Sequence, residues 1–329
     1  MWGPLPHKEE RSYIREDKNI FCFKFSRKGC GGWCLFQKAS PPPYNEKYKY
    51  IKEDMNMKVL DAKFVKEFVD MADDGYSNGY HERNGGNLSY RIKPEEMLEI
   101  VHEMRVDREW MDIGASVPGL AGDYFMVTGT GRFFHHVKED PENNCGIIRI
   151  DDTGTKYQIL WGFADGGRPT SELPTHLLNH QIKKEQTDGK HRVIYHCHPA
   201  NLIALTFVLP LTDAAFTKEL WPNMTECPVV FPDGIGVLPW MVCGSMDIGL
   251  ATCEKMKQYD AVIWAHHGVF VSGESFDIAF GLCHTIEKSA EIAVKIRSMQ
   301  PMRRQTMTRP MFEALAKAFN LKLAEKFLR

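Results

Sequence analysis

The stretch Arg192–His198, RVIYHCH, is the part of the sequence that best defines the fold. Alternate side chains of a β-strand point to opposite faces of its sheet. His196 and His198 are therefore expected on one face, while Cys197 points the other way into the core. Two imidazoles on one face of a strand lie close enough to bind a single metal ion, so this strand is the first candidate for a metal site.

A second histidine-containing segment completes the candidate site. A catalytic metal site commonly has three protein ligands and an open position. The segment Trp264–Gly268, WAHHG, follows an apolar run and supplies two adjacent histidines. Either His266 or His267 fits as the third ligand. Imidazole ligands suit Zn²⁺, although Mn, Fe and Co remain open on ligand type alone. The histidines without a partner at ligand spacing are predicted not to bind metal: His135, His136, His176, His180 and His284.

One carboxylate stands out at a predicted helix start. Glu172 follows Thr170 and Ser171 after a Gly-rich turn, and either of these two is a suitable N-cap. A glutamate here is commonly a capping-box residue or a partner of the helix dipole. Beside a metal ion it is instead suited to act as a general base. The sequence leaves both interpretations open.

Three polar turns are suited to hold an anion: Asn84–Asn87, Thr128–Gly131 and Thr170–Ser171. Glycine lets backbone N–H groups approach a ligand closely, and Asn, Thr and Ser side chains add neutral donors. Each turn is weak evidence alone. Together they predict a phosphate site built on neutral donors, without the lysine of a P-loop.

The remaining pattern predicts an α/β domain over residues 55–329. Apolar residues recur at helical spacing in residues 58–75, 172–184, 200–208, 248–258, 276–299 and 310–319. Strands are predicted at residues 88–92, 123–128, 146–150, 157–162, 226–231 and 261–265. A central mixed or antiparallel sheet flanked by helices is expected. Residues 1–54 contain the run Pro41–Pro43 and no sustained periodicity, which predicts a disordered extension or a start codon assigned too far upstream.

The composition argues against nucleic acid and membranes as binding partners. The formal net charge is −2, with no basic patch of the kind that binds nucleic acid or anionic membranes. No run approaches the roughly 18 apolar residues of a membrane span. Nine cysteines lack the spacing of a disulfide framework, so we expect reduced thiols and a cytoplasmic protein.

Seven segments occur in a characteristic order across residues 58–319. They are Glu82–Leu88, Val127–Gly131, Thr170–Pro174, His196–His198, Phe231–Gly234, Leu238–Trp240 and His267–Phe270. Together they resemble the class II aldolase/adducin family. Residues 1–54 have no counterpart in that family.

The resemblance implies a class II aldolase (adducin head-like) α/β fold with a central, mainly antiparallel sheet flanked by helices. It also implies a homotetramer with active sites near subunit interfaces and one Zn²⁺ per subunit. The implied metal ligands are His196, His198 and His267, and the implied catalytic carboxylate is Glu172. Glu226, before a predicted strand, resembles a second acid–base contributed by a neighbouring subunit. The implied phosphate-binding residues are Asn84, Gly85, Asn87, Thr130, Gly131 and Ser171.

The activity implied is zinc-dependent cleavage of a ketose 1-phosphate. L-Rhamnulose 1-phosphate is the expected substrate, giving dihydroxyacetone phosphate and L-lactaldehyde. Cleavage of L-fuculose 1-phosphate, or 4-epimerisation of a pentulose phosphate, would use the same zinc and phosphate sites. An adducin-like binding module without metal chemistry is the alternative of another class, and the intact histidines and Glu172 argue against it.

Overall fold

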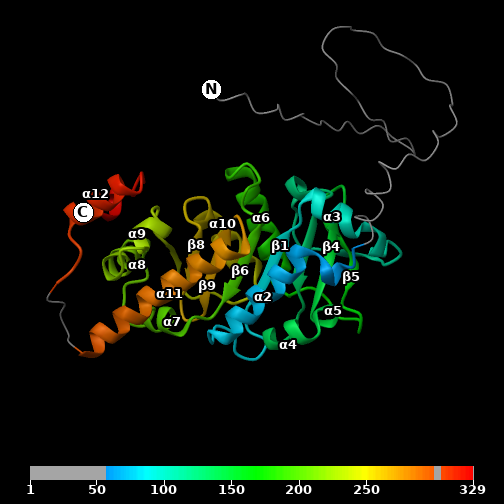
Figure 1. Ribbon diagram of the computed structural model, residues 1–329, viewed down its shortest axis with the longest axis horizontal. Coiled ribbons are helices and arrows are strands. Elements are labelled where there is room, and N and C mark those ends of the chain that lie inside the picture. Colours follow the sequence, from blue (N-terminus) through cyan, green and yellow to red (C-terminus); the bar gives the residue numbers. More distant parts are fainter. Residues whose placement is uncertain (1–56, 300–304, 329) are drawn as a thin grey trace, which may run out of the picture. The chain divides into compact units, whose positions relative to one another are not determined.

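The computed structural model describes residues 57–299 and 305–328, so residues 1–54 of the predicted extension lie outside the described part. Within the described ranges, nine strands form one sheet in the order β2-β5-β4-β3-β1-β6-β9-β8-β7 (Figure 1). The strands are β1 Asn87–Arg91, β2 Trp110–Asp112, β3 Tyr124–Thr128, β4 Cys145–Ile150, β5 Lys156–Gly162, β6 Val193–Cys197, β7 Gly236–Leu238, β8 Ala261–Trp264 and β9 Gly268–Gly273.

Neighbouring strands run antiparallel except for the edge pair β7 and β8, which is parallel among the strands described. This confirms the mainly antiparallel sheet. Strand β6 sits between β1 and β9, and its register pairs Asn87 with His196 and Phe270 with His196. The sheet thereby brings the loops before β1 and before β9 to the same end of β6.

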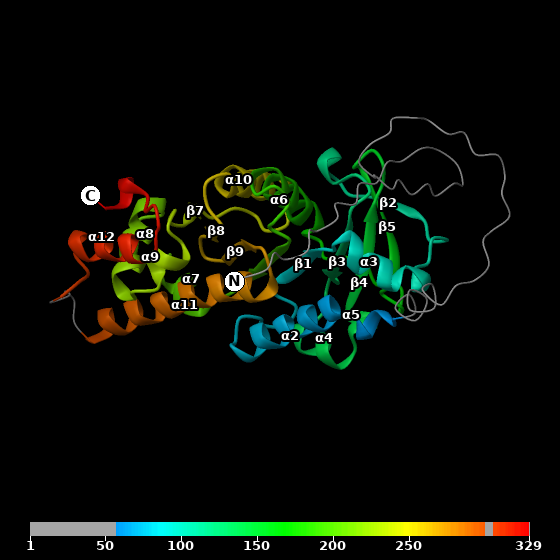
Figure 2. The ribbon, with the colours of Figure 1, turned by 45° about the horizontal axis from the view of Figure 1, so that its top comes forward.

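Helices cover both faces of this sheet. They are α2 Lys63–Ser77, α3 Pro94–Ile100, α4 Phe134–Glu139, α5 Pro141–Asn144, α6 Leu173–Gln186, α7 Ala200–Leu205, α8 Asp213–Leu220, α9 Cys227–Val230, α10 Met246–Met256, α11 Phe276–Met299 and α12 Arg309–Ala318. Figure 2 shows α6 and α10 on one side of strands β8 and β9, and α11 on the other.

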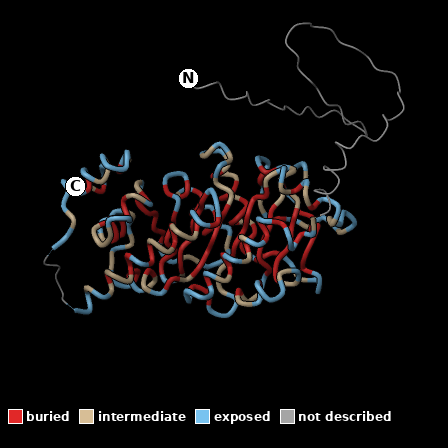
Figure 3. Tube along the Cα trace, in the orientation of Figure 1, coloured by how far each residue is buried: buried red, intermediate tan, exposed pale blue. Residues whose placement is uncertain are grey.

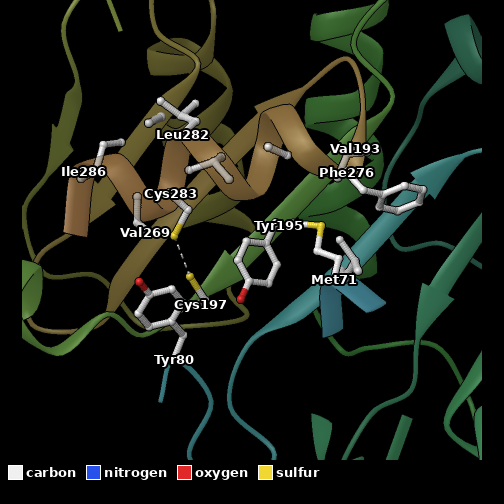
Figure 4. Packing of buried hydrophobic residues seen from close by; sticks show 14 of the residues in the cluster. Met71, Tyr80, Val193, Tyr195, Cys197, Val269, Phe276, Leu282, Cys283 and Ile286 are labelled. Atoms are coloured by element: carbon white, nitrogen blue, oxygen red, sulfur yellow. Dashed lines mark hydrogen bonds between the residues drawn. The ribbon is translucent and has the colours of Figure 1, made fainter. Parts of the chain in front are cut away.

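The alternation predicted for β6 is confirmed. Val193, Tyr195 and Cys197 lie in the large apolar core beneath α11, as Figure 4 shows. Ile194 belongs to a separate apolar cluster with residues of α10, on the opposite face. Figure 3 shows the traces of the strands as mostly buried, with exposed positions concentrated in turns and on outer helix faces.

Several predicted boundaries agree with the structure. The long helix α11 has the predicted limits, and the strands at 146–150 and 157–162 form the predicted antiparallel pair β4 and β5. The predicted helix 58–75 begins later, at Lys63, after a separate 3₁₀ turn. The predicted helix 200–208 ends earlier, at Leu205. No helix in the described part of the chain is long and apolar enough to cross a membrane.

The predicted strand 226–231 is wrong. This segment forms the short helix α9, with Glu226 as its N-cap residue. An apolar run of this length does not distinguish strand from helix by periodicity. Pro228 explains the outcome, because proline suits the first turn of a helix and cannot donate a hydrogen bond to a neighbouring strand.

Candidate active site

Three histidines converge at one end of β6. His196 lies on the strand, His198 follows its last residue, and His267 lies in the turn between β8 and β9. The Nε2 atom of His196 is 3.3 Å from Nε2 of His198 and 3.3 Å from Nε2 of His267. Among the described residues, these three form the group able to hold a metal ion, with ligand atoms within 4.8 Å of one another.

The Nδ1 atoms of His196 and His198 have hydrogen-bond partners that fix the orientation of the two rings. Nδ1 of His196 is 2.9 Å from the Val269 carbonyl oxygen, and Nδ1 of His198 is 2.7 Å from the Glu82 carboxylate. Both acceptors require Nδ1 to donate, which leaves each Nε2 with a free lone pair. Metal-binding histidines commonly donate their other N–H to a carboxylate or carbonyl in this way.

Burial favours the neutral imidazoles that a metal ion requires. Burial, and then the neighbouring His198 and His267, lower the pKa of His196 well below its usual value. Burial lowers the pKa of His267 to about 4, with His198 acting in the same direction. At neutral pH these rings are unprotonated, so the donor set fits a divalent metal bound by nitrogen ligands.

The adjacent histidines 266 and 267 have different environments. His266 adopts a positive φ of 60°, and its ring packs on Phe207 with Nδ1 3.0 Å from Thr206 Oγ1. Its neighbour His267 turns towards His196 and His198. The next position, 268, requires glycine, because a Cβ there would lie 2.3 Å from the Cys197 carbonyl oxygen. The tight turn therefore selects His267 for the three-histidine group.

Glu172 lies buried next to the histidines. Its Oε2 atom is 3.9 Å from Nε2 of His196 and accepts a 2.8 Å hydrogen bond from Nδ2 of Asn87. Although Glu172 occupies the N-cap position of α6, its side chain makes no capping hydrogen bond, and neither Thr170 nor Ser171 is the N-cap as predicted. Burial raises the pKa of Glu172, while the Asn87 hydrogen bond lowers it. A buried carboxylate with a raised pKa is suited to proton transfer.

The three predicted anion-binding turns lie together. Thr128 Oγ1 accepts a hydrogen bond from the N–H of Leu88, which follows the turn Asn84–Asn87. The N–H of Thr170 donates to the Thr128 carbonyl, and the N–H of Thr130 donates to the Arg168 carbonyl. These bonds join the second and third turns side by side. The side chains of Asn84, Thr130 and Ser171 are exposed at this place.

The loop that carries Asn84 is fixed against the histidine group. The buried ring of His81 stacks on Phe134 and is 2.9 Å from the Gly85 carbonyl oxygen and 2.6 Å from the Tyr195 hydroxyl. Gly86 has a φ of 78°, and a Cβ there would lie 2.6 Å from the His196 carbonyl oxygen. Only glycine allows this approach without displacement of the strand.

Asn87 and Glu226 differ from the other candidates. Asn87 is buried, and both ends of its amide already have protein partners, Glu172 and His176. Glu226 is exposed at the start of α9 and is not part of the three-histidine group.

Sequence reasoning assigned no role to Glu82, which hydrogen-bonds to His198 across 116 positions of sequence. No local signal identifies such a partner. Only the pairing of β1 with β6 brings the loop before β1 to His198.

Comparison with known proteins identifies the family of this chain. Residues 66–294 match the family model of the class II aldolase and adducin N-terminal domain, and the chain belongs to this family. It is 46% identical over 263 residues to the rhamnulose-1-phosphate aldolase of Klebsiella pneumoniae subsp. pneumoniae, covering 80% of this chain and 95% of that protein. It is 45% identical to the rhamnulose-1-phosphate aldolase of Mannheimia succiniciproducens, covering 80% and 96%.

A solved structure gives the same result for the fold. The crystal structure of a sugar-phosphate aldolase from Thermotoga maritima is similar, with a TM-score of 0.64 and 30% sequence identity. The match covers 73% of this chain and 97% of that one.

Proposed function

We propose that this protein is a zinc-dependent lyase that cleaves L-rhamnulose 1-phosphate to dihydroxyacetone phosphate and L-lactaldehyde, in the cytoplasmic breakdown of L-rhamnose. The observation that carries the proposal is the buried Glu172 carboxylate 3.9 Å from His196, one of three histidines whose Nε2 atoms converge. The 46% identity to a rhamnulose-1-phosphate aldolase over nearly all of that protein supports the choice of substrate.

His196, His198 and His267 would hold one Zn²⁺ per subunit. When bound, a zinc ion supplies Lewis-acid polarisation of a carbonyl and stabilises negative charge on oxygen. Glu172 removes the C3 proton of dihydroxyacetone phosphate in the direction of synthesis and returns it in the direction of cleavage. Its burial supports this role, because burial raises the pKa of the carboxyl group and makes it a stronger base than an exposed glutamate.

The phosphate group of the substrate would bind where the three polar turns meet. Asn84, Thr130 and Ser171 offer exposed neutral donors there, and the backbone at Gly85 and Gly131 permits close approach. Glu226 is proposed to act as the second acid–base at the hydroxyl that becomes the aldehyde oxygen. Glu226 is exposed on α9, which leaves it accessible to the active site of a neighbouring subunit in the proposed homotetramer.

One assay separates the competing activities. The purified protein is given L-rhamnulose 1-phosphate, L-fuculose 1-phosphate and unphosphorylated L-rhamnulose, and dihydroxyacetone phosphate is measured by coupled reduction. We expect the highest kcat/KM for L-rhamnulose 1-phosphate and very slow cleavage of the free ketose. A higher kcat/KM for L-fuculose 1-phosphate would show that this ketose phosphate is the substrate instead of L-rhamnulose 1-phosphate. Absence of both bound metal and aldolase activity would favour a binding module.

A further inference from the structure

Strand β1 and helix α6 face each other through five polar side chains. Asn87 and Ser89 are two positions apart on a strand, and therefore share one face. Glu172, His176 and His180 are four positions apart at the start of a helix, and therefore also share one face. All five residues are buried, with exposed fractions of 7% or less. A buried polar group destabilises the fold unless it has a hydrogen-bond partner, so each of these five side chains is expected to have one.

The five side chains form one chain of hydrogen bonds that alternates between strand and helix. Asn87 Nδ2 is 2.8 Å from Glu172 Oε2, and Asn87 Oδ1 contacts His176 Nε2. His176 Nδ1 is 2.6 Å from Ser89 Oγ, and Ser89 Oγ is 2.8 Å from His180 Nε2. The chain therefore runs from Glu172 through Asn87, His176 and Ser89 to His180.

The direction of every bond follows from its first member. An ionised Glu172 only accepts, so Asn87 presents its NH₂ to Glu172 and its oxygen to His176. His176 then donates from Nε2, and its Nδ1 accepts from the Ser89 hydroxyl. The Ser89 oxygen accepts in turn from Nε2 of His180. Burial lowers the pKa of His176 to about 3, which keeps this ring neutral and able to donate and accept at once.

We propose that Asn87, His176, Ser89 and His180 form a hydrogen-bonded chain, called the relay below, that positions the catalytic carboxylate of Glu172 for proton transfer at C3. We also propose that Asn87 hydrogen-bonds within this relay and does not bind the substrate phosphate. The inference rests on the proposed function of Glu172. It follows from the occupied amide of Asn87, which differs from the exposed donors Asn84, Thr130 and Ser171. These four are positioning residues, because they act through Glu172.

The test uses exchange of the C3 hydrogen of dihydroxyacetone phosphate with D₂O, followed by NMR on the metal-loaded protein. In this reaction the C3–H bond breaks to Glu172, its electron pair moves towards the carbonyl, and a deuteron from solvent returns through Glu172. No aldehyde is needed. Exchange without cleavage of L-rhamnulose 1-phosphate would therefore refute the proposed substrate and leave the relay tested.

His176→Leu and His176→Gln are the paired variants. Leucine cannot donate to Asn87, whereas the glutamine amide reaches about as far as Nε2 and can donate. We expect His176→Leu to slow exchange by ~10- to 100-fold, the usual effect of misplacing a catalytic group or losing its supporting partner. His176→Gln should recover most of the rate. Asn179→Leu, a buried polar residue of α6 outside the relay, is the matched control and should exchange normally.

Three further measurements separate the relay from other roles: the KM for dihydroxyacetone phosphate, the bound metal and the melting temperature. The relay predicts a near-normal KM and metal content in both His176 variants. Equal exchange rates for the leucine and glutamine variants would overturn it. So would a normal rate with a raised KM in Asn87→Leu, which would return Asn87 to the phosphate site. Exchange that fell only in proportion to the melting temperature, in Asn179→Leu as well, would reduce the relay to a structural role.

Discussion

The two faces of strands β1 and β6 have opposite chemistry. On the face beneath α11, Val193 and Cys197 pack in an apolar core, where Cys197 Sγ is 3.3 Å from Cys283 Sγ (Figure 4). On the face beneath α6, Ser89 and His196 are equally buried but hydrogen-bonded to defined partners. Residues adjacent in the sequence therefore differ in role. The face beneath α11 stabilises the fold, and the face beneath α6 carries the residues of the candidate active site.

This comparison explains why the polar face tolerates burial. An apolar residue needs only close packing, whereas each buried polar group loses free energy unless its hydrogen bonds are replaced. The partners on the polar face come from α6, β9 and the loop before β1. Substitutions on the two faces should accordingly differ in kind, with activity lost on one and stability on the other.

The largest difference is expected between neighbours on β6. His196→Ala should lose bound metal and reduce kcat/KM by ~1,000-fold or more, since a metal ion contributes several kcal/mol to transition-state stabilisation. Cys197→Ala should keep metal and kcat and lose about 1 kcal/mol of stability. Metal analysis, kinetics and denaturant unfolding on both variants measure this. Loss of metal in Cys197→Ala would show that the two faces are not independent.

The second prediction concerns Glu172→Gln. Glutamine keeps the size of the side chain and can accept from Asn87, but it cannot take a proton. We expect kcat to fall by ~100- to 10,000-fold, the usual contribution of a general acid–base group. Metal content should remain near that of the unchanged protein. Near-normal turnover with full metal content would remove Glu172 from the reaction.

On the apolar face, Ile286→Ala should affect stability alone. Ile286 is a residue of α11 that is fully buried against this face, and removing such a side chain costs about 2–5 kcal/mol. The free energy of unfolding should fall by this amount, with kcat at 25 °C unchanged in the folded protein. A reduced kcat without a change in stability would contradict the division between the faces.

The smallest effect is a pH dependence of stability from His180. Burial lowers the pKa of His180 well below its usual value, and the neighbouring His176, Arg91 and Arg192 act in the same direction. The folded protein keeps this ring neutral, whereas the unfolded chain binds a proton below pH ~6.5. Above that pH the neutral ring of His180 therefore does not reduce the stability of the fold. Below it, the free energy of unfolding falls as the pH decreases, by about 1.4 kcal/mol per pH unit for one proton.

His180→Leu isolates this contribution. Denaturant unfolding at pH 5, 5.5 and 6 should give a slope of unfolding free energy against pH that is smaller by about one proton than in the unchanged protein. Whatever the variant's stability at pH 7, identical slopes would show that His180 is charged in the folded state.

Strand β6, which carries His196, and helix α11 were predictable because their signals are local. Alternation in β6 and the 24-residue apolar pattern of α11 depend on each segment alone. The helix at Cys227–Val230 was not predictable, since a short apolar run fits a strand equally well. Its misassignment also placed Glu226 before a strand that does not exist.

The partners of the site were harder to predict than its ligands. Glu172 and His176 have helical spacing and Asn87 and Ser89 have strand spacing, so each face can be read from the sequence. That the two faces meet depends on packing between segments about 85 residues apart. For this reason the contacts of His176 and His180 with Asn87 and Ser89 were not foreseen.

The loop before β1 has a thermodynamic consequence. Glu82 holds His198, and a Cβ on Gly85 would lie 2.9 Å from the His198 ring, while Asn84 between them is a proposed phosphate donor. At the proposed sites, metal and phosphate would therefore order the same few residues, and whichever bound first would meet part of the entropic cost for the other. Equilibrium coupling is reciprocal, so inorganic phosphate should tighten metal binding by the same factor by which metal tightens phosphate binding. Glu82→Gln should weaken this cooperativity while leaving all three metal-binding nitrogens in the protein.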